Sequence, residues 1–372
     1  MRLLSGAALV AGAVLVAIVL SDLFRTVLLP RPARRIGRIA PLVGAAVAPP
    51  WLRVARRLRS PQRRQSLRGS LGPMLLVLTF LIWVDLLFVG FGLMLFGLRD
   101  DFLPPIGFGD GVYFAASAFL TISTPDAVHG SARAVVIAAG LVGLAVITLL
   151  VTFILSVHSE LTRREVLVLR TQVSAGEPPT GLALLDTYAR PGMTDRLTAL
   201  FRDWEAWAAD VLHSHRANPI LVNFHSADES GEWLAVLGSV MDAATLLIAA
   251  VENAALQPAV FSAARLFIAM GTRTVTELHT LLRLQPAVDL DGLDTIAREI
   301  RDVRQRLGML GYRMVTDEAD SIEGAIEILS EYKPQLRAVC RRLDITTART
   351  LSEVNERRTT RLVPPPAGIG LC

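Results

Sequence analysis

The sequence has 372 residues, 52% of them hydrophobic, with a formal net charge of +4 and a mean hydropathy of +0.45. A soluble globular protein is rarely so apolar, so the composition argues against an ordinary soluble enzyme and favours a membrane protein. The two cysteines, Cys340 and Cys372, supply neither a disulfide framework nor a metal-ligand spacing. Arginines gather beside apolar segments, where they indicate membrane topology rather than a nucleic-acid partner.

The first predicted element is an apolar helix over residues 3–23, which forms an N-terminal transmembrane domain of residues 1–24. About 20 apolar residues are enough to cross the hydrocarbon of a bilayer. A cleaved signal peptide is the alternative, because Arg2 precedes the apolar run. The run is long for a signal peptide and no clear small-residue cleavage site follows it, so we expect a retained helix.

A basic loop over residues 25–72 follows, and it is rich in arginine. Its arginines include Arg31, Arg34, Arg35, Arg38, Arg53, Arg56, Arg57, Arg59, Arg63, Arg64 and Arg68, with no acidic residue between them. Positive charge of this kind marks a cytoplasmic loop. Within it, residues 51–58 place apolar side chains at helical spacing against arginines. This segment either lies on the inner leaflet and binds anionic lipid headgroups or is a solvated loop.

Two further membrane spans are predicted, over residues 73–98 and 134–157. The second span contains Asp85, and a carboxylate at that depth is costly unless it faces protein or water. Asp85 is therefore a candidate functional residue, and the alternative is a protonated or hydrogen-bonded side chain against a neighbouring helix. Arg163 and Arg164 after the third span place the C-terminal half in the cytoplasm.

A short apolar segment over residues 111–120 lies between these two spans. About ten residues are too few to cross a bilayer, so the segment predicts a re-entrant half-helix. An irregular stretch follows at residues 121–126. Irregular backbone at membrane depth is tolerated where it is buried in protein or lines a water-filled path, and an inward-pointing helix C-terminus favours cations. A plain extracellular loop is the alternative.

The stretch from Tyr113 to Asp126 resembles the pore helix and selectivity filter of potassium channels. In that family Tyr-Phe opens a pore helix that ends in threonine, followed by Val-Gly-Tyr-Gly-Asp. Thr121 takes the place of the filter threonine and Ile122 that of the valine, while Asp126 matches the aspartate. The resemblance covers residues 73–160.

The resemblance implies a fold, partners and a location for this chain. A two-helix pore unit with a re-entrant loop requires four copies around one axis, so a homotetramer in the plasma membrane of a bacterium is expected. The expected partners are monovalent cations, potassium among them, and membrane lipids. Gly143 would be the hinge of the inner helix, although small residues also serve close helix packing in membranes.

The chain departs from the family where potassium is selected. Ser123, Thr124 and Pro125 replace Gly-Tyr-Gly. Proline fixes φ near −65° and removes an amide hydrogen, and serine resists the conformations that glycine allows, so the standard filter geometry is not expected to form. Three interpretations stay open: a cation pore of low selectivity, a non-conducting relative that acts as a sensor or scaffold, and a pore for another ion.

The C-terminal half predicts an all-α cytoplasmic domain over residues 161–362, with a disordered tail over residues 363–372. The third span is expected to continue as a helix through residues 163–172. Other helices are expected near residues 193–213, 231–256, 259–284, 293–308 and 322–344. Thr194 could cap the first of these, and Pro258 suits a helix start.

Residues 213–226, with Ser-His, Pro-x-Leu and Phe-x-Ser, are similar to a stretch in the C-terminal domain of bacterial potassium-channel-like proteins. A metal site is the competing interpretation, with His213, His215 and His225 beside Asp228 or Glu229. Histidines in a loop between helices more often cap or pack, so we expect no metal. No nucleotide-binding loop or nucleophile motif occurs, and neither a cofactor nor an enzymatic activity is expected.

The sequence thus predicts an all-α membrane protein with three transmembrane helices, a re-entrant pore helix with a filter loop, and an all-α cytoplasmic domain. The expected function is a cation-conducting pore with a cytoplasmic regulatory domain. A membrane-anchored sensor or scaffold is the alternative, and a metal-dependent membrane enzyme is the third hypothesis.

Overall fold

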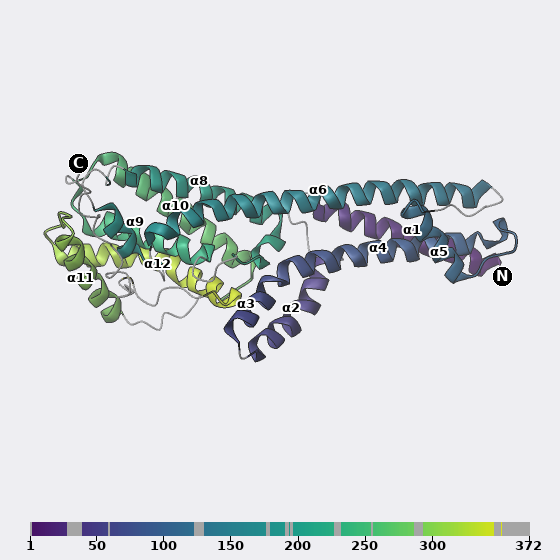
Figure 1. The fold of residues 1–372 in the computed structure, drawn as a ribbon, viewed down its shortest axis with the longest axis horizontal. Coiled ribbons are helices and arrows are strands. Elements are labelled where there is room, and N and C mark those ends of the chain that lie inside the picture. The colour runs from purple at the N-terminus through teal and green to yellow at the C-terminus, as the bar shows by residue number, and fades with distance from the viewer. Residues whose placement is uncertain are drawn as a thin grey trace, which may run out of the picture. The chain divides into compact units, whose positions relative to one another are not determined.

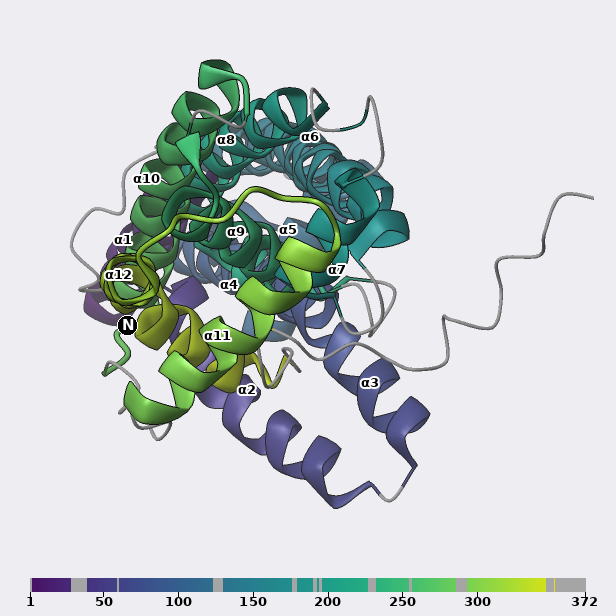
Figure 2. The ribbon, with the colours of Figure 1, turned by 90° about the vertical axis from the view of Figure 1, so that its left-hand side faces the viewer.

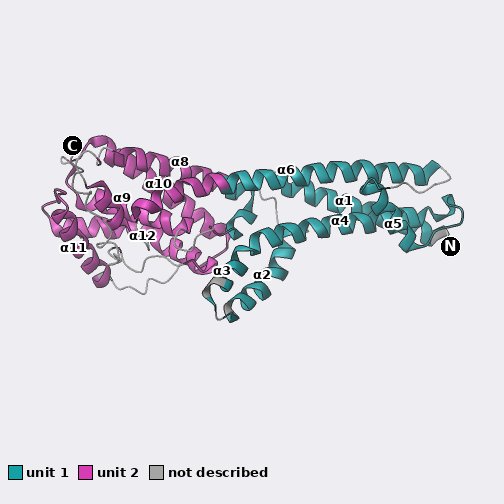
Figure 3. Ribbon diagram, viewed as in Figure 1, with its two compact units in different colours: residues 1–161, 214–224 teal, residues 162–213, 225–372 magenta. Residues whose placement is uncertain are grey.

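The computed structural model describes residues 2–27, 39–58, 60–122, 130–175, 179–189, 193, 196–226, 232–253, 256–285, 293–345 and 351. The chain divides into two compact units (Figure 1, Figure 3). Unit 1 comprises Met1–Leu161 and Ser214–Phe224, and unit 2 comprises Thr162–His213 and His225–Cys372. Among the described residues the regular elements are helices, and one isolated bridge joins Val251 and Met314.

Unit 1 contains the apolar helices of the N-terminal half. Its elements are α1 (Arg2–Val27), α2 (Ile39–Arg57), α3 (Pro61–Gly69), α4 (Leu71–Gly97), η1 (Arg99–Asp101), α5 (Phe108–Phe119), the first part of α6 (Gly130–Ala175) and η2 (Pro219–Asn223). The basic loop predicted over residues 25–72 therefore contains two helices, α2 and α3. The sequence pattern indicated helical spacing there only over residues 51–58.

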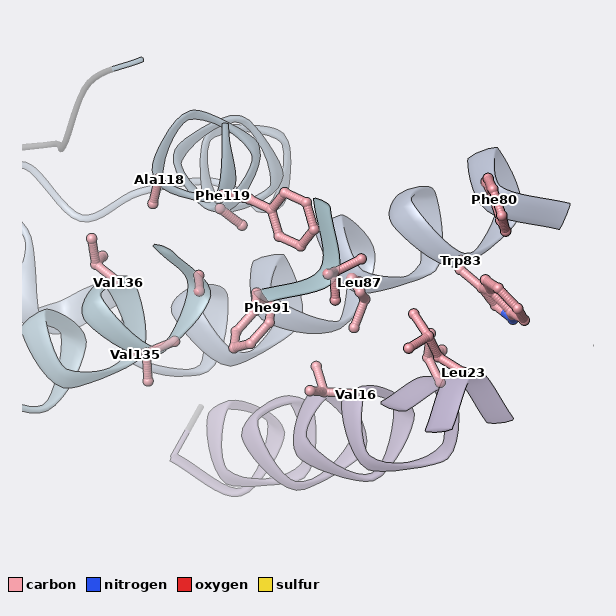
Figure 4. Packing of buried hydrophobic residues seen from close by; sticks show 14 of the residues in the cluster. Val16, Leu23, Phe80, Trp83, Leu87, Phe91, Ala118, Phe119, Val135 and Val136 are labelled. Carbon is pink, nitrogen blue, oxygen red and sulfur yellow. The ribbon is translucent and has the colours of Figure 1, made fainter. Parts of the chain in front are cut away.

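Helices α1 and α4 pack very closely because glycines lie where they cross. A Cβ atom on Gly97 would lie 2.7 Å from the carbonyl oxygen of Ser5, and one on Gly12 would overlap the backbone of Gly90. Small residues of this kind let membrane helices approach each other. In Figure 4, Val16 of α1 lies on the side that faces α4. Helix α1 therefore packs closely against α4 within unit 1.

Helix α2 packs on the first turns of α4 through its apolar face. Val43 and Ala48 form a buried cluster with Leu71 and Leu75 of α4. The indole N–H of Trp51 donates a 2.7 Å hydrogen bond to the carbonyl of Leu67. One face of the predicted lipid-binding segment is thus packed on protein.

Unit 2 is a helical bundle, and its helices agree with the predicted ones to within a few residues. They are the rest of α6, α7 (Gly181–Tyr188), α8 (Arg196–Ala217, which reaches unit 1 at its end), α9 (Trp233–Ala250), α10 (Pro258–Leu281), α11 (Leu293–Met309) and α12 (Glu318–Leu343). Pro258 opens α10, as predicted. Helix α7 was not predicted. Thr194 and the tail over residues 363–372 lie outside the described residues.

The core of unit 2 is built around α9, which lies between α7, α10 and α12 (Figure 2). The rings of Trp204 and Trp207 of α8 lie 4.6 Å apart at a tilt of 58°, and the ring of Trp207 lies 6.1 Å from that of Trp233 of α9. Tyr332 of α12 is fully buried and donates a 2.7 Å hydrogen bond to Asp242 of α9. Aromatic rings supply much of the apolar area that such a core buries.

Four helical stretches among the described residues are long and apolar enough to cross a membrane, by length and composition. They are Leu4–Val27, Ser66–Gly97, Gly130–Ala175 and Trp233–Ala250. This finding indicates a multi-pass helical membrane protein. The sequence predicted three spans, and the additional stretch is α9. Its side chains are apolar on nearly every face because other helices of unit 2 surround it, which is the second environment that suits such a helix.

Candidate functional site

Helix α5 is the short helix that the sequence predicted between the second and third spans. It has 12 residues, so it is about 18 Å long and too short to cross the hydrocarbon. Gly107 caps its start, and the backbone N–H of Gly107 donates a 2.9 Å hydrogen bond to Asp110 in the first turn. The predicted start at residue 111 was three residues late, because Phe108 to Asp110 already form the first turn.

Helix α5 lies against the half of α4 that leads to its C-terminus, and it runs in the opposite direction. At its start, a Cβ atom on Gly111 would lie 2.8 Å from the carbonyl oxygen of Gly92. At its end, the ring of Phe119 meets Phe88 edge-on at 5.2 Å. Figure 4 shows Phe119 extending from α5 toward Leu87 of α4. Phe88 lies four residues, or about 6 Å, from the middle of α4. Helix α5 therefore ends near the middle of α4.

The end of α5 contains a strained residue. Thr121 has a φ of 56°, in the left-handed region that β-branched residues rarely adopt. Its N–H donates to Ala118, and the N–H of Ile122 donates to Ser117 over 2.9 Å. These two bonds form the usual glycine-type helix ending with threonine in place of glycine. Strain of about 1–2 kcal/mol at this position marks a site whose surroundings fix its backbone.

The sequence-predicted filter residues are described only in part. Thr121 is exposed, and Ile122 is 72% exposed, so both side chains leave the packed body of unit 1. Ser123, Thr124, Pro125 and Asp126 lie outside the described residues. What they would contribute to an ion path remains a prediction.

Gly143 of α6 lies beside the last residue of α5. A Cβ atom there would overlap the carbonyl oxygen of Phe119 and lie 2.8 Å from its Cα atom. A Cβ atom on Gly140, about one turn earlier, would lie 3.4 Å from the carbonyl oxygen of Ala118. This contact gives Gly143 a packing role, which the sequence left open beside the hinge role. The hinge stays a prediction.

Asp85 of α4 has an exposed side chain and shares its exposed face with Val77 and Leu81. Among the described residues no hydrogen bond or ion pair holds its carboxylate. The neighbouring-helix partner that the sequence considered is therefore not found within the described part of a single chain. A carboxylate in the middle of a span has to face water or another protein surface to avoid a large desolvation cost.

A second acid in unit 1, Asp22, was not among the predicted site residues. It is buried near the end of α1, where it accepts a 2.8 Å hydrogen bond from the indole of Trp83 and a 3.1 Å bond from the N–H of Ile39. Asp22 thus joins α1, α4 and the first residue of α2. The signal available in the sequence was an indole N–H in mid-span, which needs an acceptor when it is buried.

Asp101 holds the end of α4 beside the start of α6. Its carboxylate accepts hydrogen bonds from the hydroxyl of Ser131 at 2.9 Å and from the N–H of Ala132 at 3.1 Å. A carboxylate here satisfies free amides in the first turn of α6 and complements the helix dipole.

The segment over residues 213–226 was singled out by its resemblance. Its 3₁₀ turn η2 packs on the start of α4, where a Cβ atom on Gly72 would lie 2.7 Å from the ring of Phe224. Leu221 is buried in the same cluster as α4. The chain that follows α8 is thereby attached to α4, which sequence reasoning did not foresee.

The histidines of the metal hypothesis have different surroundings. His225 Nδ1 lies 2.8 Å from Glu232, whose other oxygen accepts from the N–H of Ser226. His213 is exposed and His215 is buried. The part of the chain that the structure describes contains no group of three side chains suited to a metal ion, and Asp228 and Glu229 fall outside it.

No protein-family model, curated protein or solved structure matches this chain. The functional argument therefore depends on the geometry of unit 1 and on the residues quoted from the sequence.

Proposed function

We propose that this chain is a potassium-channel-like membrane protein that conducts monovalent cations with little selectivity, under the control of its helical C-terminal domain. Four copies would surround one pore in the plasma membrane, with the C-terminus in the cytoplasm. The C-terminal end of α5 and residues 121–126 would line the ion path. A non-conducting sensor or scaffold built on the same fold is the alternative.

The observation that carries the proposal is the depth at which α5 ends. Phe119 lies beside Gly143, which is 13 residues into α6 and therefore about 20 Å from the start of that helix. Asp101 lies beside the start of α6. The chain between Leu120 and Gly130 has to return over that distance, and ten residues reach about 33 Å when extended. A half-helix followed by a returning segment supports a re-entrant loop.

Two further observations support a water-filled path. The last carbonyl groups of α5 give its C-terminal end a partial negative charge, which is electrostatically favourable for a cation. Asp85 carries a carboxylate on an exposed face of α4, where lipid alone would be a poor environment. Both features are explained by a pore shared between copies.

The proposal is tested by cation flux into liposomes that contain the purified full chain. Asp126→Asn should reduce potassium and sodium flux at least several-fold, because it removes the negative charge from residues 121–126, which the proposal places along the ion path. Asp100→Asn is the matched control, since Asp100 is an exposed acid just beyond α4 and outside that segment. Flux no higher than in empty vesicles, from protein shown to be folded, would overturn conduction and favour the sensor.

A further inference from the structure

Helix α6 continues well past its apolar part. Glu160, Arg163 and Glu165 follow the last apolar stretch, and hydrocarbon is a costly environment for such side chains. The remaining turns, from Thr162 to Ala175, belong to unit 2. Exposed apolar side chains on these turns therefore face water or protein rather than lipid.

One face of these turns is already packed against α8. Buried residues recur at helical spacing along it, namely Arg164, Val168, Thr171 and Ala175. The indole of Trp204 donates a 3.0 Å hydrogen bond to the hydroxyl of Thr171, and that of Trp207 donates a 2.9 Å bond to the carbonyl of Arg164. This face is fixed within unit 2.

The opposite face presents apolar side chains to the outside. Val166 is 51% exposed, Leu169 is 56% exposed and Val173 is 75% exposed. Their spacing of three and then four residues matches the a and d positions of a coiled-coil heptad. We name these three residues the α6 stripe.

We propose that the α6 stripe packs against the α6 stripe of a second copy of this chain in a short parallel coiled coil. This inference rests on the proposed function in one respect: copies inserted in the same membrane with the same topology have their α6 helices pointing the same way. Parallel pairing then follows, because each stripe meets its own counterpart at the same height.

The charges beside the stripe complement each other in that arrangement. With Val166 at position a, Glu165 is at position g and Arg170 is at the next position e. In a parallel coiled coil, a g residue lies close to the e residue five positions later on the partner helix. Arg164 of the same copy donates to one oxygen of Glu165 at 2.9 Å, and in the parallel arrangement Glu165 of each copy would also meet Arg170 of the other, so that the pair occurs twice.

The residue types also specify how many helices join. Valine at position a with leucine at position d favours two strands over three or four. Four copies around a pore would therefore form two such helix pairs on the cytoplasmic side of the membrane. The stripe covers little more than one heptad, so its pairing depends on the high local concentration that a shared membrane provides.

The experiment is disulfide formation between copies of the full chain in liposomes. Leu169→Cys is introduced after Cys340→Ala and Cys372→Ser remove the native thiols. We expect a covalent dimer on mild oxidation, at least tenfold faster than for Leu266→Cys. That control residue is 58% exposed and belongs to α10 rather than to α6. Equal rates for the two variants would overturn the inference.

A charge exchange tests the parallel register. Glu165→Arg in the Leu169→Cys background should slow the cross-link several-fold, and adding Arg170→Glu should restore it. A cross-linking rate that neither change alters would contradict the parallel pairing. Flux measured on the same liposomes separates the two proposals: flux without cross-linking overturns only the pairing, and cross-linking without flux overturns only the pore.

Discussion

The two units bury their apolar helices to very different extents. In α9 of unit 2, 83% of an apolar 18-residue stretch is buried by the chain itself, whereas the share is 28% in α1 and in α6. Helix α4 lies between them at 44%. All four pass the same test of length and composition. Hydropathy alone therefore does not separate a helix at the centre of a bundle from one that faces lipid, and packing does.

The units also differ in how they hold charge. In unit 2, Asp242 is bonded to Tyr332 and by both oxygens to Lys333, at 2.8 Å each. In unit 1, Asp22 accepts hydrogen bonds from the N–H groups of Trp83 and Ile39, and Asp85 is exposed. Unit 2 thus neutralises its largely buried acid internally. Unit 1 leaves Asp85 for a partner or for water, which fits a pore formed by several copies.

The largest effect should follow from breaking the ion pair of unit 2. Asp242→Asn leaves Lys333 without its carboxylate in a largely buried site, and we expect a loss of about 3 kcal/mol in the free energy of unfolding. Chemical denaturation followed by tryptophan fluorescence reports it, because Trp204, Trp207 and Trp233 lie in this unit.

The control is the exposed pair between Arg301 and Glu318, whose side chains are both more than half exposed. Arg301→Met should cost less than about 1 kcal/mol. Similar losses for the two variants would show that Asp242 is not held as described.

An intermediate effect is expected at the close contact between α5 and α6. Gly143→Ala places a methyl group on the backbone of Phe119, and we expect a destabilisation of about 1–3 kcal/mol together with reduced flux. Thermal unfolding in detergent measures the first quantity. Gly130→Ala is the matched control in the same helix, since a Cβ atom there would meet no other part of the described chain within 4 Å. Equal melting temperatures would refute the close contact.

The smallest effect concerns Cys340, whose thiol should not react in the folded protein. Burial, with a smaller contribution from Glu232, raises the pKa of Cys340 from 9.0 to about 12. The thiol therefore stays protonated at neutral and mildly alkaline pH, where thiolates are the reactive form. In a Cys372→Ser variant, a thiol reagent at pH 8 should label the protein only after unfolding. Rapid labelling of the folded protein would contradict the packing of unit 2.

Much of the fold was predictable because long apolar helices have strong signals. The periodicity predicted α8, α10 and α11, and the length of the apolar runs predicted α1, α4 and α6. Helix α2 was only partly indicated, because Pro49 and Pro50 inside it argue against a helix. Helix α7 was missed because eight residues give little periodicity.

The candidate site was predictable only where chemistry is local. The short helix α5 follows from its length, and Asp85 follows from a charge inside a span. Asp22 was overlooked because its role depends on Trp83, which is 61 residues away. The contact of Gly72 with Phe224 depends equally on tertiary packing. No residue pattern along the chain specifies such pairs.

The most direct test of the central claim is whether the end of α5 lines an ion path. In a chain without native thiols, Ile122→Cys places a thiol at an exposed position just after that helix. A cationic thiol reagent added to the outside during current recording in a planar bilayer should block the current. Leu103→Cys, which is 75% exposed between α4 and α5, should be labelled without block. A current that persists after complete labelling of Ile122→Cys would contradict the claim that the chain after α5 lines the pore.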